Sequence, residues 1–415
     1  MSFKISKNTL RELVRCIPLF CFCILASLSK FVPTICLFLL VLLLGLQIFS
    51  IICSGKLYVN MSLFWVIGML IIYINNNAYF MPNSLAHMIY FLLFPICILF
   101  ASIGGYQNSK WINLLLNMLK GAYIVYIIFT ILMFASRSVL QFVCGLFPEE
   151  ANTIIRQYNE AGIPGLTTHY STNGMLLAVG TVIFGSYAIV KKNKFNIILF
   201  SFSIIALLLS GKRAHIVFGI LAFYLTYYVY NSGKKKNRII KSLGVLLLGT
   251  TVFVIASYFV PALGTVVGRF IDTADSGDIS SGRIDVWMNA IETISSHTFI
   301  GIGWEQYVNQ GGWFWNIHNI YLQLYIETGI LGSIFYIGWF TFHLCRTWRL
   351  YSYMRINEKY YSKNDVCFIN FSLAMQILFL LYGFTGNPLY EAIMYVPYFI
   401  ACAISVYYVK YYKPL

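Results

Sequence analysis

Residues 33–53 of the chain read PTICLFLLVLLLGLQIFSIIC, an apolar run without a single charged side chain. A helix needs about 20 such residues to cross the hydrocarbon core of a bilayer. Comparable runs recur along the whole chain, and we expect spans near 16–30, 33–53, 60–76, 86–104, 112–135, 171–190, 195–210, 214–231, 242–262, 321–344, 366–384 and 389–408. The sequence therefore predicts an all-α polytopic membrane protein with about 12 transmembrane helices.

The composition indicates the same class of protein. Of the 415 residues, 59% are hydrophobic and only 10% are charged, and the mean hydropathy is +0.74. Soluble domains carry about a quarter charged residues. A soluble globular domain is therefore excluded.

The net charge of +15 has a topological explanation. If the N-terminus lies in the cytoplasm, most of the 29 lysines and arginines fall in segments on the cytoplasmic side. Cytoplasmic loops of membrane proteins carry such an excess of basic residues. We therefore expect both termini to be cytoplasmic, and the basic balance does not indicate nucleic-acid binding.

The ten cysteines do not indicate a disulfide framework or a zinc site. Most lie in or beside apolar runs, and only Cys144 approaches a loop expected on the outer side. Cys21 and Cys23 form a C-x-C pair without the two-pair spacing of a zinc site. We expect these cysteines to be packing residues.

Two polar segments interrupt the short loops, and both are expected outside the membrane on the outer side. They cover residues 136–170 and 263–320, and the second is a large extracytoplasmic loop between spans 9 and 10. Loops of this length in a compact protein are usually functional or disordered.

The second loop contains a predicted amphipathic helix. Ser280, Ser281 and Gly282 offer N-cap chemistry, and apolar residues then recur at helical spacing in Ile284, Trp287, Ile291 and Ile294, with Ala290 on the same side. We expect this helix to lie against the mouth of the bundle or the outer interface, with Trp287 at headgroup depth. It is either a structural lid or a direct contact for a substrate.

The same loop offers one alternative for a metal site. Asp272, Asp275 and Asp278 are spaced by three residues, but the glycine and glutamate of a calcium-binding loop are absent. A solvated acidic loop is the favoured interpretation, so we expect no metal.

A few ionisable or polar residues stand where a site on the outer side could use them, namely Lys212, Arg213, Arg283, His318, Asn319, Glu327 and His169. An arginine guanidinium makes bidentate, charge-assisted bonds to phosphate and stays protonated when partly desolvated. A histidine with an ordinary pKa near 6.5 suits a general acid or base. Taken singly, each residue is better explained by a structural role, such as loop or headgroup contacts.

The order of these residues carries more information than any one of them. The chain has Gly282-Arg283 followed by Trp287, then Gly301-x-Gly303, then His318-Asn319-x-Tyr321-Leu322, and then Glu327-x-Gly329-x-x-Gly332. This succession resembles the signature of the O-antigen ligase and Wzy-type O-antigen polymerase family, and Ser210-Gly211-Lys212-Arg213 resembles its upstream arginine motif. Two positions depart from the family pattern: Thr298 follows His297 where proline is common, and Lys212 stands where serine is common.

The resemblance implies a GT-C-like membrane fold and a metal-independent, inverting glycosyltransferase without a cofactor. Members of the family transfer a glycan from an undecaprenyl diphosphate carrier on the outer face of the bacterial cytoplasmic membrane. On this basis Arg213 and Arg283 would hold the diphosphate and His318 would activate the acceptor hydroxyl. The expected substrate-binding residues are Lys212, Asn319, Glu327 and His169, of which Glu327 is favoured as a brace for the helix start.

The expected function is polymerisation of lipid-linked oligosaccharide repeat units into a surface polysaccharide such as O-antigen, capsule or exopolysaccharide. The alternatives are a ligase that transfers the polymer to a separate acceptor, and a lipid or polysaccharide transporter. The expected partners are the undecaprenyl-diphosphate-linked oligosaccharide and the lipid bilayer, together with a flippase and a chain-length regulator, and no nucleic acid.

Overall fold

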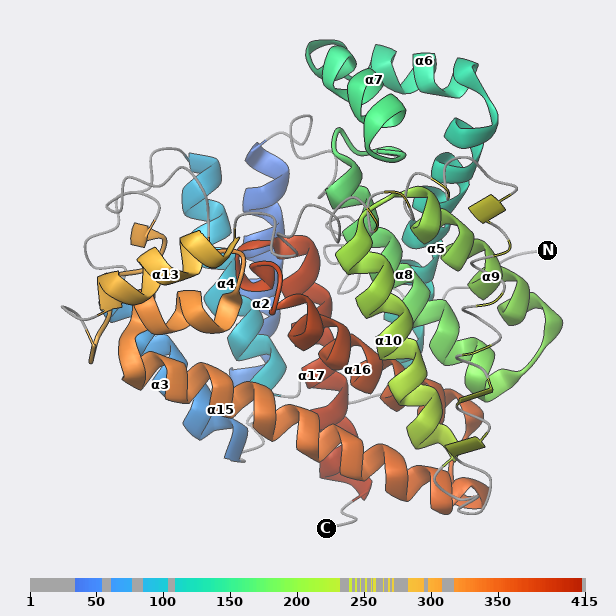
Figure 1. Ribbon diagram of the computed structural model, residues 1–415. Helices are drawn as coiled ribbons and strands as arrows, with labels where there is room; N and C mark the ends of the chain where they lie inside the picture. Colours follow the sequence, from blue (N-terminus) through green and yellow to red (C-terminus); the bar gives the residue numbers. More distant parts are fainter. Residues whose placement is uncertain are drawn as a thin grey trace.

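The computed structural model describes residues 34–53, 61–76, 85–103, 109–231, 283–294, 298–307 and 317–412, with scattered positions between 239 and 271. The regular elements in these ranges are all helices (Figure 1). Five of them are long and apolar enough to cross a membrane, covering Ile112–Ala135, Tyr170–Lys191, Ile320–Ile356, Lys363–Tyr382 and Ala392–Lys410.

Ten of the expected apolar runs are helices, and all but α15 have nearly the expected bounds. They are α2 (Thr34–Cys53), α3 (Met61–Asn76), α4 (Leu85–Ile103), α5 (Ser109–Ala135), α8 (Tyr170–Lys191), α9 (Lys194–Leu209), α10 (Arg213–Tyr230), α15 (Ile320–Ile356), α16 (Lys363–Tyr382) and α17 (Ala392–Tyr412). The expected span at 16–30 lies outside the described residues, and of that at 242–262 only scattered positions are described.

Helix α15 continues well beyond the expected end at residue 344, to Ile356. Its last part contains Arg346, Arg349 and Arg355, which lower the hydropathy but are good helix formers. Hydropathy therefore predicts the apolar part of this helix but not the residue at which the helix ends.

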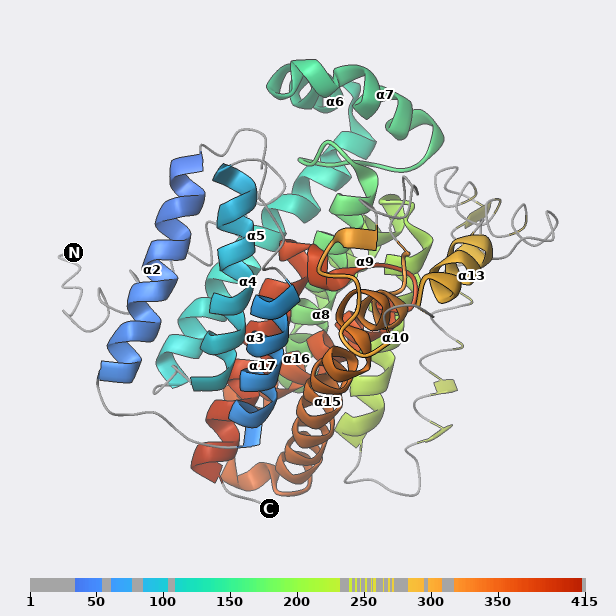
Figure 2. The same ribbon diagram turned by 90° about the vertical axis from the view of Figure 1, so that its left-hand side faces the viewer.

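Helices α8, α16 and α17 form the centre of the bundle. The apolar window of α8 is 100% buried inside the protein, and that of α16 is 89% buried. Helices α2, α3 and α4 lie on one side of this centre and α5, α9 and α10 on the other, while α15 crosses the bundle obliquely (Figures 1 and 2). Small residues permit the close packing, since a Cβ at Gly185 of α8 would lie 2.8 Å from the ring of Phe223.

The helix directions bring distant parts of the chain to one end of the bundle, here called the site end. Helices α3, α5, α9 and α16 end there, and α8, α10, α15 and α17 begin there. The opposite end is basic and carries Lys191, Lys192, Arg355 and Lys359. At that end Arg355 donates to the carbonyl oxygen of Tyr230 at 3.0 Å.

The segment 136–170 contains a helical hairpin at the site end, which hydropathy did not predict. It consists of α6 (Arg137–Leu146), the short η2 (Pro148–Glu150) and α7 (Ala151–Glu160), and it stands above the bundle in Figure 1. Val143, Phe147, Ile154 and Ile163 form a small apolar core beneath it.

Candidate functional site

The Gly301-x-Gly303 and Glu327-x-Gly329 motifs form a single backbone junction. Helix α15 is interrupted at Gly329, which has a φ of 66° and a ψ of −171°. The loop that follows α13 (Arg283–Ile294) supplies partners around this break. The amide of Ile302 donates to the carbonyl of Ile326 at 3.0 Å, and the amide of Ile330 donates to the carbonyl of Thr298 at 3.0 Å.

Glycine is required at this junction because two backbones approach each other closely. A Cβ at Gly301 would lie 2.4 Å from the carbonyl carbon of Glu327, and a Cβ at Gly329 would lie 2.3 Å from the carbonyl oxygen of Phe299. Both glycines also have a positive φ, a conformation that costs other residues roughly 1–2 kcal/mol. The two glycine motifs therefore fix the loop onto α15.

Glu327 is fully buried beside this junction. One carboxylate oxygen accepts from the Gln323 side chain at 3.0 Å, and the other accepts from the hydroxyl of Tyr390. Its backbone oxygen accepts from the Asn76 side chain at 2.7 Å. These contacts join α15 to α3 and to the link before α17, and they favour the interpretation of Glu327 as a brace.

His318 stands in a tightly held link before α15. Its φ of 54° lies in the left-handed region, which persists in a non-glycine residue only where the surroundings fix it. Here the Trp287 indole donates to the carbonyl of Ile317 at 2.8 Å. On the other side, the amide of Ile320 donates to the carbonyl of Gly383 at 2.8 Å.

Asn319 completes the fixation as the N-cap of α15. Its side-chain oxygen accepts from the amides of Tyr321 at 3.1 Å and Leu322 at 3.2 Å. Such a cap satisfies amides that have no partner within the helix. The side-chain oxygen of Asn319 therefore supports the position of His318.

Helix α13 holds the same link from the other side. Val286, Trp287 and Ala290 pack in a small core with Ile317 and residues of the first turns of α15. The predicted helix is thus confirmed, although Ile284 and Ile291 are 54% and 57% exposed and do not pack in this core. Trp287 acts here as a hydrogen-bond donor to the His318 link.

Three basic residues and His318 are linked by electrostatic interactions. The pKa of His318 is lowered by burial, and then by the positive charges of Arg283 and Lys212. The pKa of Arg283 is lowered by burial; the field of Tyr382 opposes this shift, whereas the charge of Arg213 adds to it. The structure thus brings together Lys212 and Arg213 at the start of α10, Arg283 at the start of α13, and His318 before α15. We call the three basic residues, together with His318 beside them, the cationic cluster.

Their placement at helix starts has an electrostatic consequence. The N-terminus of a helix presents unpaired amides and a partial positive charge, which favour a bound anion. Arg213 is the first residue of α10 and Arg283 the first of α13. The cationic cluster therefore combines side-chain and helix-end charge of the same sign, which suits a phosphate group.

His169 lies near the cluster, in a capping position. Its Nδ1 accepts from the amide of Ser171 at 3.1 Å at the start of α8. Its pKa is lowered by partial burial and by the positive charge of Lys212. The Lys212 ammonium in turn lies 5.6 Å from the ring centre of Tyr170.

Glu391 and Tyr382 lie beside the cationic cluster, and the sequence did not single them out. The Tyr382 hydroxyl donates to Glu391 at 3.3 Å. Burial raises the pKa of Glu391 to about 7, although the Tyr382 hydrogen bond and the charge of Lys212 oppose the shift. Glu391 was not singled out because hydropathy placed it inside an expected span at 389–408. A lone acidic residue within a span is itself a functional signal, and it could have identified Glu391.

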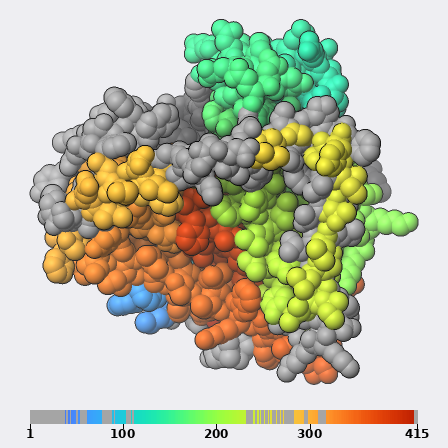
Figure 3. Space-filling model, in the orientation of Figure 1, coloured from blue at the N-terminus to red at the C-terminus, as the bar shows by residue number. Residues whose placement is uncertain are grey.

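A buried histidine extends this polar region into the bundle. His215, two residues after Arg213, is fully buried, and its ring centre lies 4.7 Å from that of Tyr382. In Figure 3 the α16–α17 region, in red, is visible between α13 and α15 in orange and α10 in yellow-green. The cationic cluster and the Tyr382–Glu391 pair thus come from the helices that surround one part of the surface.

The described residues contain no group of three or more histidine, cysteine or acidic side chains arranged to hold a metal ion. The acidic run Asp272, Asp275 and Asp278 lies outside the described residues.

A comparison with curated proteins found no match to this chain. A family model described as O-antigen ligase matches residues 197–337. The matched segment runs from α9 into α15 and includes the four residues of the cationic cluster, Asn319 and Glu327, but not His169, Tyr382 or Glu391. Residues 197–337 of this multi-pass membrane protein are therefore similar to the O-antigen ligase family, the resemblance that the motifs indicated.

Proposed function

We propose that this protein is a glycosyltransferase that polymerises oligosaccharide repeat units carried on a lipid diphosphate. The observation that carries the proposal is the cationic cluster at one end of an apolar bundle, in which the charges of Arg283 and Lys212 act on His318 and the charge of Arg213 acts on Arg283. A substrate with a diphosphate, a sugar and a long hydrocarbon chain matches such a site at the boundary of a membrane.

The arginines supply the transition-state stabilisation. As the bond between the anomeric carbon and the diphosphate breaks, negative charge builds on the diphosphate oxygen. Preorganised cations aimed at that oxygen lower the barrier. Arg213 and Arg283 provide planar donors for bidentate binding, and Lys212 adds a compact charge. This assignment needs no metal.

The acceptor hydroxyl attacks the anomeric carbon from the side opposite the diphosphate. A new C–O bond forms, the bond to the diphosphate breaks with its electron pair, and the hydroxyl proton passes to a base. His318 is the proposed base because its lowered pKa keeps the imidazole neutral at pH 7. Glu391 is the alternative, since a carboxyl with a pKa of about 7 also accepts a proton near neutrality.

We place the site on the outer face of the cytoplasmic membrane. The end of the bundle opposite the site carries Lys191, Lys192, Lys194, Arg355 and Lys359. Basic residues accumulate on the cytoplasmic side of membrane proteins. The cationic cluster then faces outward, where a transported lipid-linked repeat unit and a growing polysaccharide meet. A flippase and a chain-length regulator are the partners that this reaction calls for.

A second function is favoured by the description of the matching family, which is that of a ligase. A ligase would use the same cluster and the same base but would transfer the finished glycan to a different acceptor. The chemistry at the anomeric carbon is the same in both reactions.

Reconstitution with a lipid-diphosphate-linked repeat unit tests both functions. A polymerase produces a ladder of products on a gel from this substrate alone, and the His318→Ala variant, at equal protein level, produces none. Transfer that occurs only after addition of a separate acceptor identifies a ligase. Retention of the ladder by His318→Ala would exclude this residue as the base. Movement of intact substrate across the proteoliposome membrane, without transfer of its glycan, would indicate a transporter.

A further inference from the structure

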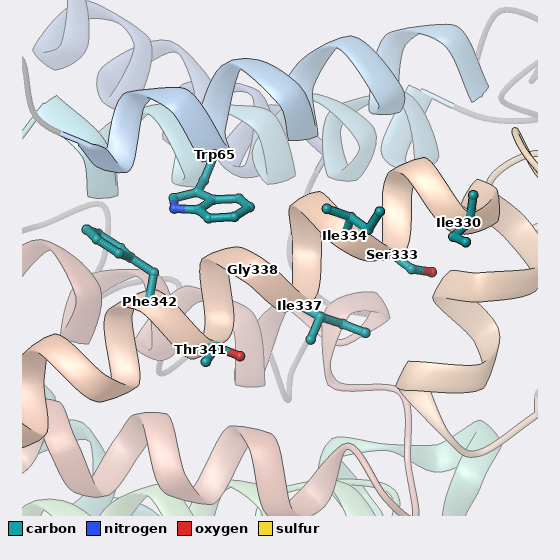
Figure 4. Close-up of a pocket in the computed structure, with 8 residues that line it drawn as sticks. All are labelled: Trp65, Ile330, Ser333, Ile334, Ile337, Gly338, Thr341 and Phe342. Carbon is teal, nitrogen blue, oxygen red and sulfur yellow. The ribbon is translucent and has the colours of Figure 1, made fainter.

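An apolar groove runs along the surface between α3 and α15 (Figure 4). A cavity of about 580 Å³ opens sideways between the two helices, and its walls include Trp65 of α3 and Ile334, Ile337 and Phe342 of α15. Figure 4 shows Trp65 and Phe342 in the space between these helices. Gly338 permits this arrangement, since a Cβ there would lie 2.1 Å from the Trp65 ring.

The groove continues toward the basic end of the bundle. A second hollow of about 410 Å³ shares Thr341 and Phe342 with the first and is also lined by Arg346 and Arg349. Together the two hollows extend from Ile330 to Arg349 along α15. At 1.5 Å per residue this is a length of about 28 Å along the helix.

Exposed apolar residues also occur on the loop that contacts the upper end of this groove and on the helix before that loop. Ile330 binds the loop at Thr298, and Phe299 and Ile300 of that loop are 71% and 54% exposed. On α13 the exposed residues Ile284, Met288 and Ile291 share one face. This helix begins at Arg283, a residue assigned to the diphosphate.

We propose that the α3–α15 groove binds the polyprenyl chain of the lipid-diphosphate donor, an inference that rests on the proposed function. A phospholipid acyl chain fills only one leaflet, which is half of the ~30 Å core. The groove is about twice as long as such a chain along α15, and the loop at its upper end follows the helix that begins at Arg283. A single long hydrocarbon chain with a diphosphate at its end matches both properties.

The groove acts by orientation rather than by a hydrophobic driving force, since lipid tails are as apolar as its walls. A polyprenyl chain packed between Trp65 and Ile337 would restrict how its diphosphate approaches Arg283. Occupation of the groove therefore sets the affinity for long-chain donors and leaves the transfer chemistry unchanged.

The test compares two donors that carry the same sugar, one with the full-length polyprenyl chain and one with a short, detergent-soluble chain. Ile337→Trp fills the groove, and Ile205→Trp is the matched control, since Ile205 is a 45% exposed residue of α9 outside the groove. We expect Ile337→Trp to raise the KM for the long-chain donor about fivefold, with no change for the short-chain donor. Ile205→Trp should change neither.

An equal change for both donors, or no change for either, would overturn the groove assignment while leaving the transferase intact. Activity with the short-chain donor shows at the same time that Ile337→Trp is folded. If the wild-type protein transfers sugar from neither donor, the proposed function fails and the groove assignment fails with it.

Photo-crosslinking gives a second measurement that does not depend on turnover. A photoreactive residue in place of Ile334 should capture radiolabelled long-chain donor, and the same residue in place of Ile205 should not. Capture of bulk phospholipid alone at position 334, with excess donor present, would contradict the proposal.

Discussion

At the scale of single residues, the site depends on the charge state of His318. Its pKa lies below the ordinary value near 6.5 because burial and the charges of Arg283 and Lys212 disfavour the imidazolium ion. The neutral ring is the form that accepts a proton. We therefore expect kcat/KM to be constant from pH 7 to 8 and to fall only below about pH 6.5.

The pH profile also separates the two candidate bases. If Glu391 takes the proton, activity falls as the pH drops through about 7, the raised pKa of its carboxyl. The Glu391→Gln variant should then lose activity at every pH. A profile with its midpoint near 7 in the wild type, together with an inactive Glu391→Gln variant, would contradict the assignment to His318.

The arginines lead to a separate prediction about geometry. Lysine retains the charge of Arg283 but lacks the planar fork that binds two phosphate oxygens. We expect Arg283→Lys to lower kcat/KM for the lipid-diphosphate donor by about tenfold or more, the equivalent of ~1.4 kcal/mol or more. The control is Arg156→Lys, an exposed substitution on α7 that should leave the rate unchanged. Wild-type activity in Arg283→Lys would show that charge alone is sufficient.

At the scale of elements, the junction between α15 and the loop after α13 is predicted to depend on the glycines of both segments. Gly329→Ala places a Cβ 2.3 Å from the Phe299 carbonyl oxygen at a φ of 66°. We expect this variant to lose about 1–3 kcal/mol of stability, seen as a lower Tm in detergent, and to lose activity as well. In Gly145→Ala, at an α6 glycine with no atom within 4 Å of its Cβ, the Tm should stay unchanged or rise. Equal Tm values for the two variants would argue against a strained junction.

The sequence was sufficient for the elements whose signal is local. Long apolar runs determine the helices of the bundle, so their positions could be predicted closely, including α2 and α8. The α6–α7 hairpin could not be predicted in this way, because its helices are short and only one face of each is apolar. Its packing depends on a core with Ile163 and Leu209 from outside the hairpin.

The candidate site divides in a similar manner. The residues of the cationic cluster were found because they belong to a recognisable succession of motifs. Glu391 and Tyr382 were missed, because their relation to Lys212 depends on how α16 and α17 meet α10 in space. The role of the glycines as a junction also required the structure, since Gly301 and Gly329 contact each other's backbone neighbours across 28 positions of sequence.

At the scale of the whole molecule, the account predicts one orientation in the membrane. Glu160 at the end of α7 lies at the site end, and Lys359 after α15 lies at the basic end. In a background without other accessible cysteines, Glu160→Cys should react with an impermeant thiol reagent added outside the cell. Lys359→Cys should react only after the membrane is opened. The reverse pattern would place the cationic cluster in the cytoplasm.

The most direct test of the central claim is the product ladder made from a lipid-diphosphate-linked repeat unit by purified, reconstituted protein. The wild type, Arg283→Ala and the control Arg156→Ala are run side by side at equal protein level. The account predicts a ladder from the wild type and the control, and none from Arg283→Ala, where a cation assigned to the diphosphate is missing. A full ladder from Arg283→Ala would contradict the claim that the cationic cluster carries the transfer reaction.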